Sequence, residues 1–92
     1  MTSKERARLR SLAASENTIV QIGKSGITEQ VIASVDTALA ARELIKGRVL
    51  ESSMLTAGEA CEMLAEACHA EPVQAIGTKF VLYRKKEDKK TR

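Results

Sequence analysis

The chain has 92 residues, of which 43% are apolar, enough for one domain with an ordinary hydrophobic core. No apolar run approaches the roughly 20 residues that span a bilayer, and no signal-peptide pattern follows the basic start, so we expect a soluble, cytoplasmic protein without membrane contact. Phe80 is the only phenylalanine and Tyr83 the only tyrosine, and tryptophan is absent, so aliphatic side chains must build the core.

The net charge is only +3, but the charges are segregated along the sequence. Residues 4–10 carry four cations and one acid, residues 51–71 carry five acids and no cation, and residues 79–92 carry seven cations and two acids. Clustered cations favour a polyanion such as nucleic acid, because they release counterions from its phosphates. For the last segment alone, a solvated basic tail is the simpler alternative.

The first half of the chain predicts a helix, a strand and a second helix. Thr2 and the acid three residues later have the spacing of a capping box, and helical apolar spacing follows over Ser3–Ala14. The β-branched run Thr18–Ile22 predicts a strand. Thr28 is a good N-cap for a helix that ends near Arg42.

The second half predicts a strand, a third helix and a hairpin. In the strand 44–51, Lys46 and Arg48 should share one face, because strand side chains alternate. Thr56 opens a second capping box, and Pro72 is expected to stop the helix. Two further apolar runs, 73–76 and 80–84, flank a glycine turn and predict a β-hairpin.

The resulting order αβαβαββ predicts an α/β (α+β) fold with a mixed four-stranded sheet and helices packed on it. We expect one domain over residues 1–84, followed by a basic disordered tail over residues 85–92. No repeat or linker divides the sequence.

The turn Gly23-Lys24-Ser25-Gly26 lies between the first strand and the second helix, where free backbone amides attract phosphate. A nucleoside-triphosphate loop is excluded, because its pattern requires glycine where this chain has Thr18. The four-residue G-x-x-G turn instead resembles the loop with which KH domains clamp a nucleic-acid backbone. A plain strand-to-helix turn remains the alternative when the motif is taken alone.

Three blocks in order, VQIGKSGITEQVI, ARELIKGRV and VQAIGTKFVLYR, resemble the CRM domain (chloroplast RNA splicing and ribosome maturation) in its single-domain bacterial, YhbY-like form. The resemblance covers Ser3 to Arg84. It implies two layers with a mixed sheet whose fourth strand is antiparallel and internal, similar to the C-terminal domain of translation initiation factor three. It also implies binding to structured ribosomal RNA and to precursors of the large (50S) subunit, with no catalytic residues and no cofactor.

The resemblance places RNA contacts on the G-x-x-G loop and on basic residues of the first helix, the second helix end and the strands. The expected RNA-binding residues are Gly23, Lys24, Ser25, Gly26, Thr28, Lys46, Arg48, Arg42, Lys4, Arg8 and Arg84. Which cations of the first helix touch RNA stays open. Gly47 departs from the family, where a β-branched residue is common, and is expected to weaken its strand.

The remaining candidates for chemistry have simpler interpretations. Cys61 and Cys68 lie about 10 Å apart along one helix at ~1.5 Å per residue, too far for a disulfide or a shared metal, and are expected in the core. His69 is expected at a helix end or surface, and the acids of the third helix on a solvated face. Tyr83 could stack on a base, but packing is the favoured interpretation.

Two rival functions come from other classes. An adaptor could grip a ribosomal protein through the acidic third helix, whereas an enzyme would need a nucleophile–base pair or metal spacing that the sequence does not show. With so few aromatic residues, we expect recognition of RNA shape and phosphates by a monomer, with affinity that falls steeply with salt.

Overall fold

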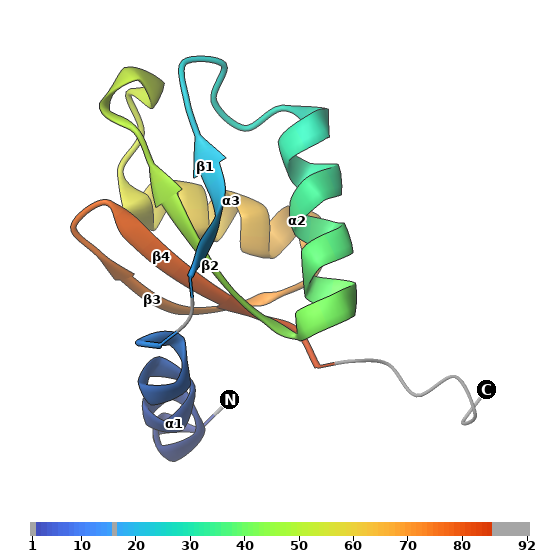
Figure 1. Cartoon of the computed structure of the whole chain (residues 1–92), viewed down its shortest axis with the longest axis vertical. Coiled ribbons are helices and arrows are strands. Elements are labelled where there is room, and N and C mark those ends of the chain that lie inside the picture. The colour runs from blue at the N-terminus through green and yellow to red at the C-terminus, as the bar shows by residue number, and fades with distance from the viewer. Residues whose placement is uncertain (1, 16, 86–92) are drawn as a thin grey trace.

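The computed structural model describes residues 2–15 and 17–85 (Figure 1). Over these residues the elements are α1 (Ser3–Ala13), β1 (Thr18–Ile22), α2 (Glu29–Arg42), β2 (Leu44–Val49), a short 3-10 helix (Glu51–Ser53), α3 (Ala57–Cys68), β3 (Glu71–Ile76) and β4 (Lys79–Tyr83). The predicted order αβαβαββ is confirmed, and the 3-10 turn replaces the expected end of the second strand. The predicted basic tail falls, after Lys85, outside the described residues.

The described strands form one mixed sheet in the order β1-β2-β4-β3. Strands β1 and β2 are parallel, because α2 connects them as a crossover. Helix α3 then carries the chain to the far edge, where β3 begins, and the hairpin folds β4 back between β3 and β2. Strand β4 is therefore antiparallel to both neighbours and internal, as the resemblance implied.

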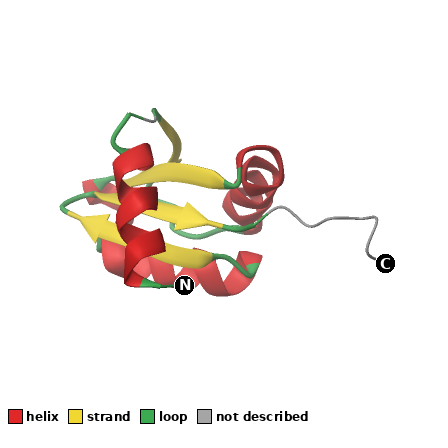
Figure 2. Cartoon of the chain, turned by 90° about the horizontal axis from the view of Figure 1, so that it is seen from below, coloured by secondary structure: helices red, strands yellow, loops and turns green. Residues whose placement is uncertain are grey.

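The two faces of the sheet carry different helices. Helices α2 and α3 cover one face, over a core that includes Val35, Leu39, Ile45, Leu64 and Phe80. Helix α1 crosses the strands on the opposite face (Figure 2). A smaller cluster there contains Leu9, Ala13, Leu44, Val73 and Val81. The sheet and its two helices are the predicted layers, and α1 adds a cover on the other side.

The threonine caps form as predicted. The Thr56 hydroxyl accepts from the Glu59 amide at 3.1 Å while the Glu59 carboxylate accepts from the Thr56 amide at 3.0 Å, which completes a capping box. At α1 the Thr2 hydroxyl accepts from the Glu5 amide at 3.1 Å, but the Glu5 carboxylate accepts from that hydroxyl instead of the Thr2 amide. Helix α1 thus begins at the expected residue, with one of the two hydrogen bonds of the predicted capping box.

The expectation that Pro72 stops α3 is wrong. The helix ends at Cys68, because His69 adopts the left-handed conformation (φ 55°) and its amide donates to the Ala65 carbonyl. Pro72 lies inside β3, an edge strand, where a residue without an N–H group is tolerated. His69 is exposed at the helix end, as expected.

Gly47 has a packing role that the sequence interpretation missed. It lies directly opposite Phe80 in the antiparallel pair of β2 and β4, and the Phe80 ring is fully buried. A Cβ atom on residue 47 would come within 2.8 Å of three ring carbons, closer than real contacts allow. The expectation of a weakened strand left this contact out: the Phe80 ring fills the space that the missing side chain leaves.

The two cysteines are core thiols, as predicted. Cys61 and Cys68 are both buried and free. Burial raises the pKa of the Cys61 thiol to about 11, helped by the nearby Glu62 carboxylate, and burial also raises the pKa of Cys68. Neither thiol is therefore activated as a nucleophile at neutral pH.

Candidate nucleic-acid interface

The loop between β1 and α2 is an open turn. The Gly26 amide donates to the Gly23 carbonyl at 2.9 Å, and Gly26 has φ +70°, a conformation that favours glycine. Lys24 and Ser25 are exposed at the tip. Beyond its chain neighbours, a Cβ atom at Gly26 would meet nothing within 4 Å, and one at Gly23 would meet only the Leu50 side chain at 3.7 Å, so the tip of the turn is open.

The backbone amides at the tip are available to a ligand. Within the part of the chain that the structure describes, the amides of Lys24 and Ser25 donate to no acceptor. Thr28 is already engaged in its own helix, since its hydroxyl accepts from the Val31 amide at 3.1 Å. The turn therefore offers two amides, an ammonium and a hydroxyl, and Thr28 fixes the start of α2 behind it.

Hydrogen bonds place two other segments at the same end of the sheet. The Leu50 amide donates to the Ile22 carbonyl and the Val49 amide to the Thr78 carbonyl, both at 2.8 Å. The start of the 3-10 helix therefore lies beside the end of β1, from which the G-x-x-G turn leaves. The β3–β4 turn lies on the far side of β2, at the same end of the sheet. Glu29 and Glu51 begin the elements that flank the turn, so carboxylates as well as cations surround it.

Lys79 belongs to this end of the sheet, although it is absent from the expected RNA-binding set. It is exposed and pairs across the sheet with Arg48. Two strand spacings separate its strand from β1, which is roughly 10 Å at ~4.8 Å per strand. The hairpin pattern of the sequence located Lys79 beside a turn, but only the register of β4 against β2 brings it to Arg48.

Lys46 and Arg48 project from β2 on the face that α1 covers. The Lys46 ammonium lies 3.5 Å from the Ala13 carbonyl oxygen, at the C-terminal end of α1, where the helix dipole favours a cation. The Nε atom of Arg48 is buried and has no hydrogen-bond partner among the described residues. Lys46 thus joins α1 to the sheet, whereas the half-buried Arg48 side chain makes no hydrogen bond or ion pair within residues 2–15 and 17–85.

The other expected cations lie away from the turn. Lys4 and Arg8 are exposed on α1, and Arg42 is the exposed last residue of α2. Arg8 and Arg42 line one pocket beside Leu44, at the opposite end of β2 from the G-x-x-G turn. The structure therefore divides the expected RNA-binding residues between the two ends of the sheet.

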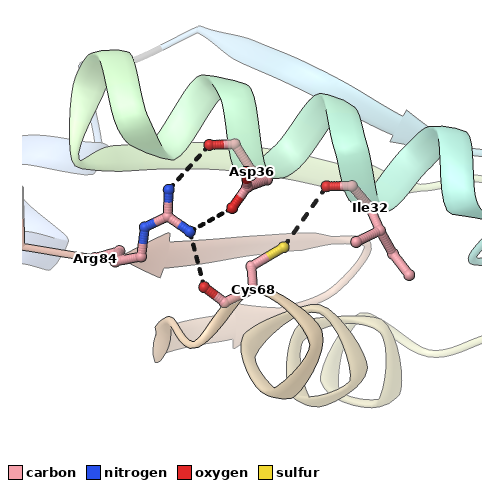
Figure 3. Close-up of polar contacts among 4 residues, drawn as sticks. All are labelled: Ile32, Asp36, Cys68 and Arg84. Atoms are coloured by element: carbon pink, nitrogen blue, oxygen red, sulfur yellow. Dashed lines mark hydrogen bonds and ion pairs between the residues drawn. The ribbon is translucent and has the colours of Figure 1, made fainter.

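Arg84 is tied to α2 and α3 by hydrogen bonds (Figure 3). Its Nη1 atom donates to Asp36 Oδ1 at 2.6 Å and to the Cys68 carbonyl at 2.8 Å, and its Nη2 atom donates to the Asp36 carbonyl at 3.0 Å. Beside it, the Cys68 thiol contacts the Ile32 carbonyl at 3.7 Å. Arg84 therefore joins the end of β4 to α2 and α3, which gives it a structural role.

The charged helices lie on opposite sides of the sheet. Helix α1 carries Lys4, Arg6, Arg8 and Arg10 with one acid, all exposed. Helix α3, on the other side, exposes Glu59, Glu62 and Glu66 and has no cation (Figure 2). The segregation of charge along the sequence thus becomes a separation between the two faces of the domain.

Other kinds of site are not found in residues 2–15 and 17–85. No group of three or more His, Cys, Asp or Glu side chains is placed to hold a metal ion there. None of the helices described is long and apolar enough to cross a bilayer.

The fold and the turn define a small α/β domain with an open G-x-x-G turn and one cationic face. Residues 1–84 match the CRS1/YhbY (CRM) domain family. The chain belongs to this family, as the three sequence blocks predicted.

Relatives match nearly the whole chain. The probable RNA-binding protein YqeI of Bacillus subtilis is 36% identical over 98% of this chain and 94% of its own length. An RNA-binding protein of Haemophilus influenzae is 34% identical over 98% and 91%. The solution structure of the hypothetical protein SAV1595 from Staphylococcus aureus, described as a candidate RNA-binding protein, has a TM-score of 0.77 and 40% identity and covers 99% of this chain and 95% of that one.

Proposed function

We propose that the protein binds structured ribosomal RNA and acts in the assembly of the large (50S) ribosomal subunit. The observation that carries the proposal is the open turn, whose Lys24 and Ser25 amides have no acceptor among the described residues. Relatives named as RNA-binding proteins support it. The proposal requires neither a cofactor nor a second copy of the chain, and places the protein in the cytoplasm.

The turn would hold the sugar-phosphate backbone rather than read bases. Its glycines allow close approach, its two free amides donate to phosphate oxygens, and the Lys24 ammonium adds a charge-assisted contact. Arg48, one strand spacing from β1, and Lys79, two spacings or roughly 10 Å away at ~4.8 Å per strand, would meet a neighbouring phosphate. Such contacts recognise RNA by shape, and they weaken with salt because counterions return to the phosphates.

The test reverses the charge at the turn. Lys24→Glu removes the ammonium and places a carboxylate beside the free amides, so we expect affinity for large-subunit ribosomal RNA fragments to fall roughly tenfold or more. The slope of log affinity against log salt should become shallower by about 1. Filter binding over a salt series measures both quantities.

Lys85→Glu is the matched control, because it makes the same charge change at an exposed residue at the other end of the sheet. Lys46→Glu is a poor choice, since it would place a carboxylate against the Ala13 carbonyl at the end of α1 and destabilise the fold. Lys79→Glu is the better second variant. Thermal unfolding shows that each variant remains folded.

Wild-type affinity and salt slope in both Lys24→Glu and Lys79→Glu would overturn the proposed site. If the protein instead joins precursor particles but not naked ribosomal RNA, the adaptor function takes its place. That outcome would direct attention to the acidic face of α3, where Met63 is exposed among the glutamates. Sedimentation of the protein with 50S precursors separates the two functions.

A further inference from the structure

A pocket of about 450 Å³ lies between α1 and the sheet, at the end of β2 remote from the G-x-x-G turn. Its volume falls within the roughly 300–1,000 Å³ that ligand sites occupy. Leu9 and Leu12 line it from α1, Arg42 from the end of α2, and Leu44 and Tyr83 from the sheet. The strand β2, about 17 Å from Leu44 to Val49 at ~3.3 Å per residue, separates the pocket from the turn.

Tyr83 gives this pocket an aromatic wall. It packs partly against the cluster of Leu44, Val73 and Val81, so the core supports the ring while part of it stays exposed. Its hydroxyl has no partner among the described residues. The favoured interpretation of Tyr83 as a packing residue accounts for the buried part of the ring and leaves the exposed part available.

Two arginines line the same pocket. Arg8 reaches it from α1 and Arg42 from α2, and neither makes an ion pair within the described part of the chain. Arginine donates to phosphate in a fork geometry and also stacks on bases. An aromatic surface with two such side chains beside it matches the two chemical parts of a nucleotide, the base and the phosphate.

We propose that this pocket holds one unpaired nucleotide of the bound RNA, with the base against Tyr83 and the flanking phosphates on Arg8 and Arg42. This inference rests on the proposed RNA-binding function and adds a second contact, of different chemistry, to the phosphate-holding turn. It assigns the pocket to RNA with a bulge or an unpaired end.

Two carboxylates in the pocket lining favour a nucleotide over a simple anion as the ligand. Glu5 and Glu43 face the pocket along with Arg8 and Arg42, so the charges of the lining cancel. A free phosphate ion would gain little from such a site. A nucleotide within RNA gains the stacking energy of its base as well, and its affinity therefore does not depend on net charge alone.

The test compares two RNAs that differ by one nucleotide. One is a blunt-ended duplex, and the other is the same duplex with a single unpaired adenosine bulge. We expect the bulged RNA to bind more tightly by roughly 5- to 150-fold, the range that stacking on an aromatic side chain provides. Inorganic phosphate serves as the probe for a simple anion site and should not compete.

Tyr83 offers a direct readout, because it is the only tyrosine of the protein. Ring-selective ¹³C labelling of tyrosine therefore gives signals from Tyr83 alone. On titration with the bulged duplex these signals should shift upfield, as stacked rings do, and the blunt duplex should shift them much less.

Variants locate the effect in the pocket. Tyr83→Leu keeps an apolar side chain against the core but removes the ring, and Arg8→Gln removes one phosphate partner. Both should abolish most of the preference for the bulge, measured as the ratio of the affinities for the bulged and the blunt duplex. Arg10→Gln is the matched control, since it makes the same change on α1 outside the pocket lining.

Different results would contradict the nucleotide pocket and the proposed RNA-binding function. Equal affinity of the wild-type protein for both RNAs, or unmoved Tyr83 signals with the bulged duplex, would overturn the nucleotide pocket while the turn still binds RNA. Loss of the bulge preference in Arg10→Gln as well as Arg8→Gln would also overturn it. Binding of neither RNA by the wild-type protein would overturn the proposed function itself.

Discussion

At the scale of single residues, Arg84 shows how a cation can be withdrawn from a binding surface. Its guanidinium bonds the Asp36 carboxylate and carbonyl and the Cys68 carbonyl, at the end of α3 where carbonyls lack helical partners (Figure 3). The Arg84 side chain is 25% exposed and the Asp36 side chain 58%. Solvent therefore weakens the ion pair, and the bond to the Cys68 carbonyl is the more valuable contact.

We expect Arg84→Met to lower the free energy of unfolding by about 1–2 kcal/mol, because the Cys68 carbonyl loses a charged donor and the exposed ion pair adds little. Lys85→Met removes the same charge from the next, exposed residue and should change stability by less than about 0.5 kcal/mol. Urea unfolding followed by far-UV circular dichroism measures both. The two variants should bind ribosomal RNA alike; a drop confined to Arg84→Met, with stability unchanged, would restore Arg84 to the RNA-binding surface.

The residues of the turn could be located from the sequence, whereas the roles of Lys46 and Arg84 could not. Gly23 and Gly26 bracket a four-residue turn between a strand and a helix, and this local pattern fixes the turn. Lys46 meets the Ala13 carbonyl 33 positions away, and Arg84 meets Asp36 48 positions away. Contacts at such separations depend on how the helices dock on the sheet, which residue spacing does not encode.

At the scale of elements, one residue pair, Gly47 with Phe80, fits β2 and β4 against each other. Phe80 is fully buried and crosses the space above Gly47, its direct partner in the ladder. The pair explains how a glycine can occupy a central strand, where it would otherwise weaken packing. The large ring and the missing side chain are complementary in volume.

We expect Gly47→Ala to destabilise the fold by about 1–3 kcal/mol, because the new methyl group would overlap the fully buried Phe80 ring. Gly58→Ala is the matched control: it makes the same change in α3, where the new Cβ would meet nothing closer than 3.8 Å, and alanine favours the helix. Guanidinium unfolding of both variants measures the difference. Equal stability of Gly47→Ala and the wild type would show that Phe80 can move aside.

The bounds of elements followed from the sequence wherever a local pattern marked an end. Strand β1 over Thr18–Ile22 and the three helix starts have the expected places, because β-branched runs and threonine caps act locally. The prediction from Pro72 was wrong, because a proline is compatible both with the end of a helix and with an edge strand. The choice depends on β3 lying at the edge of the sheet, a property of the topology.

At the scale of the whole molecule, the sheet separates two charged surfaces. The cations of α1 and the strand cations Lys46 and Arg48 lie toward one face, and the acids of α3 lie toward the other (Figure 2). A polyanion can then approach the α1 face while the domain keeps a net charge of only +3. The location of the charge, more than its sum, should decide how RNA binds.

Two triple variants test whether the position of the charges or the net charge of the protein decides RNA binding. Replacing Lys4, Arg6 and Arg10 by glutamine lowers the net charge from +3 to 0, and replacing Glu59, Glu62 and Glu66 by glutamine raises it from +3 to +6. We expect only the α1 variant to change binding of large-subunit ribosomal RNA substantially, with lower affinity and a salt slope shallower by roughly 0.7–0.9 for each phosphate that the variant no longer neutralises. The α3 variant should bind within about threefold of the wild type, because its charges lie across the sheet and beyond a Debye length of ~8 Å in physiological salt. A rise in affinity of the α3 variant as large as the fall in the α1 variant would mean that net charge governs binding and that RNA has no preferred face.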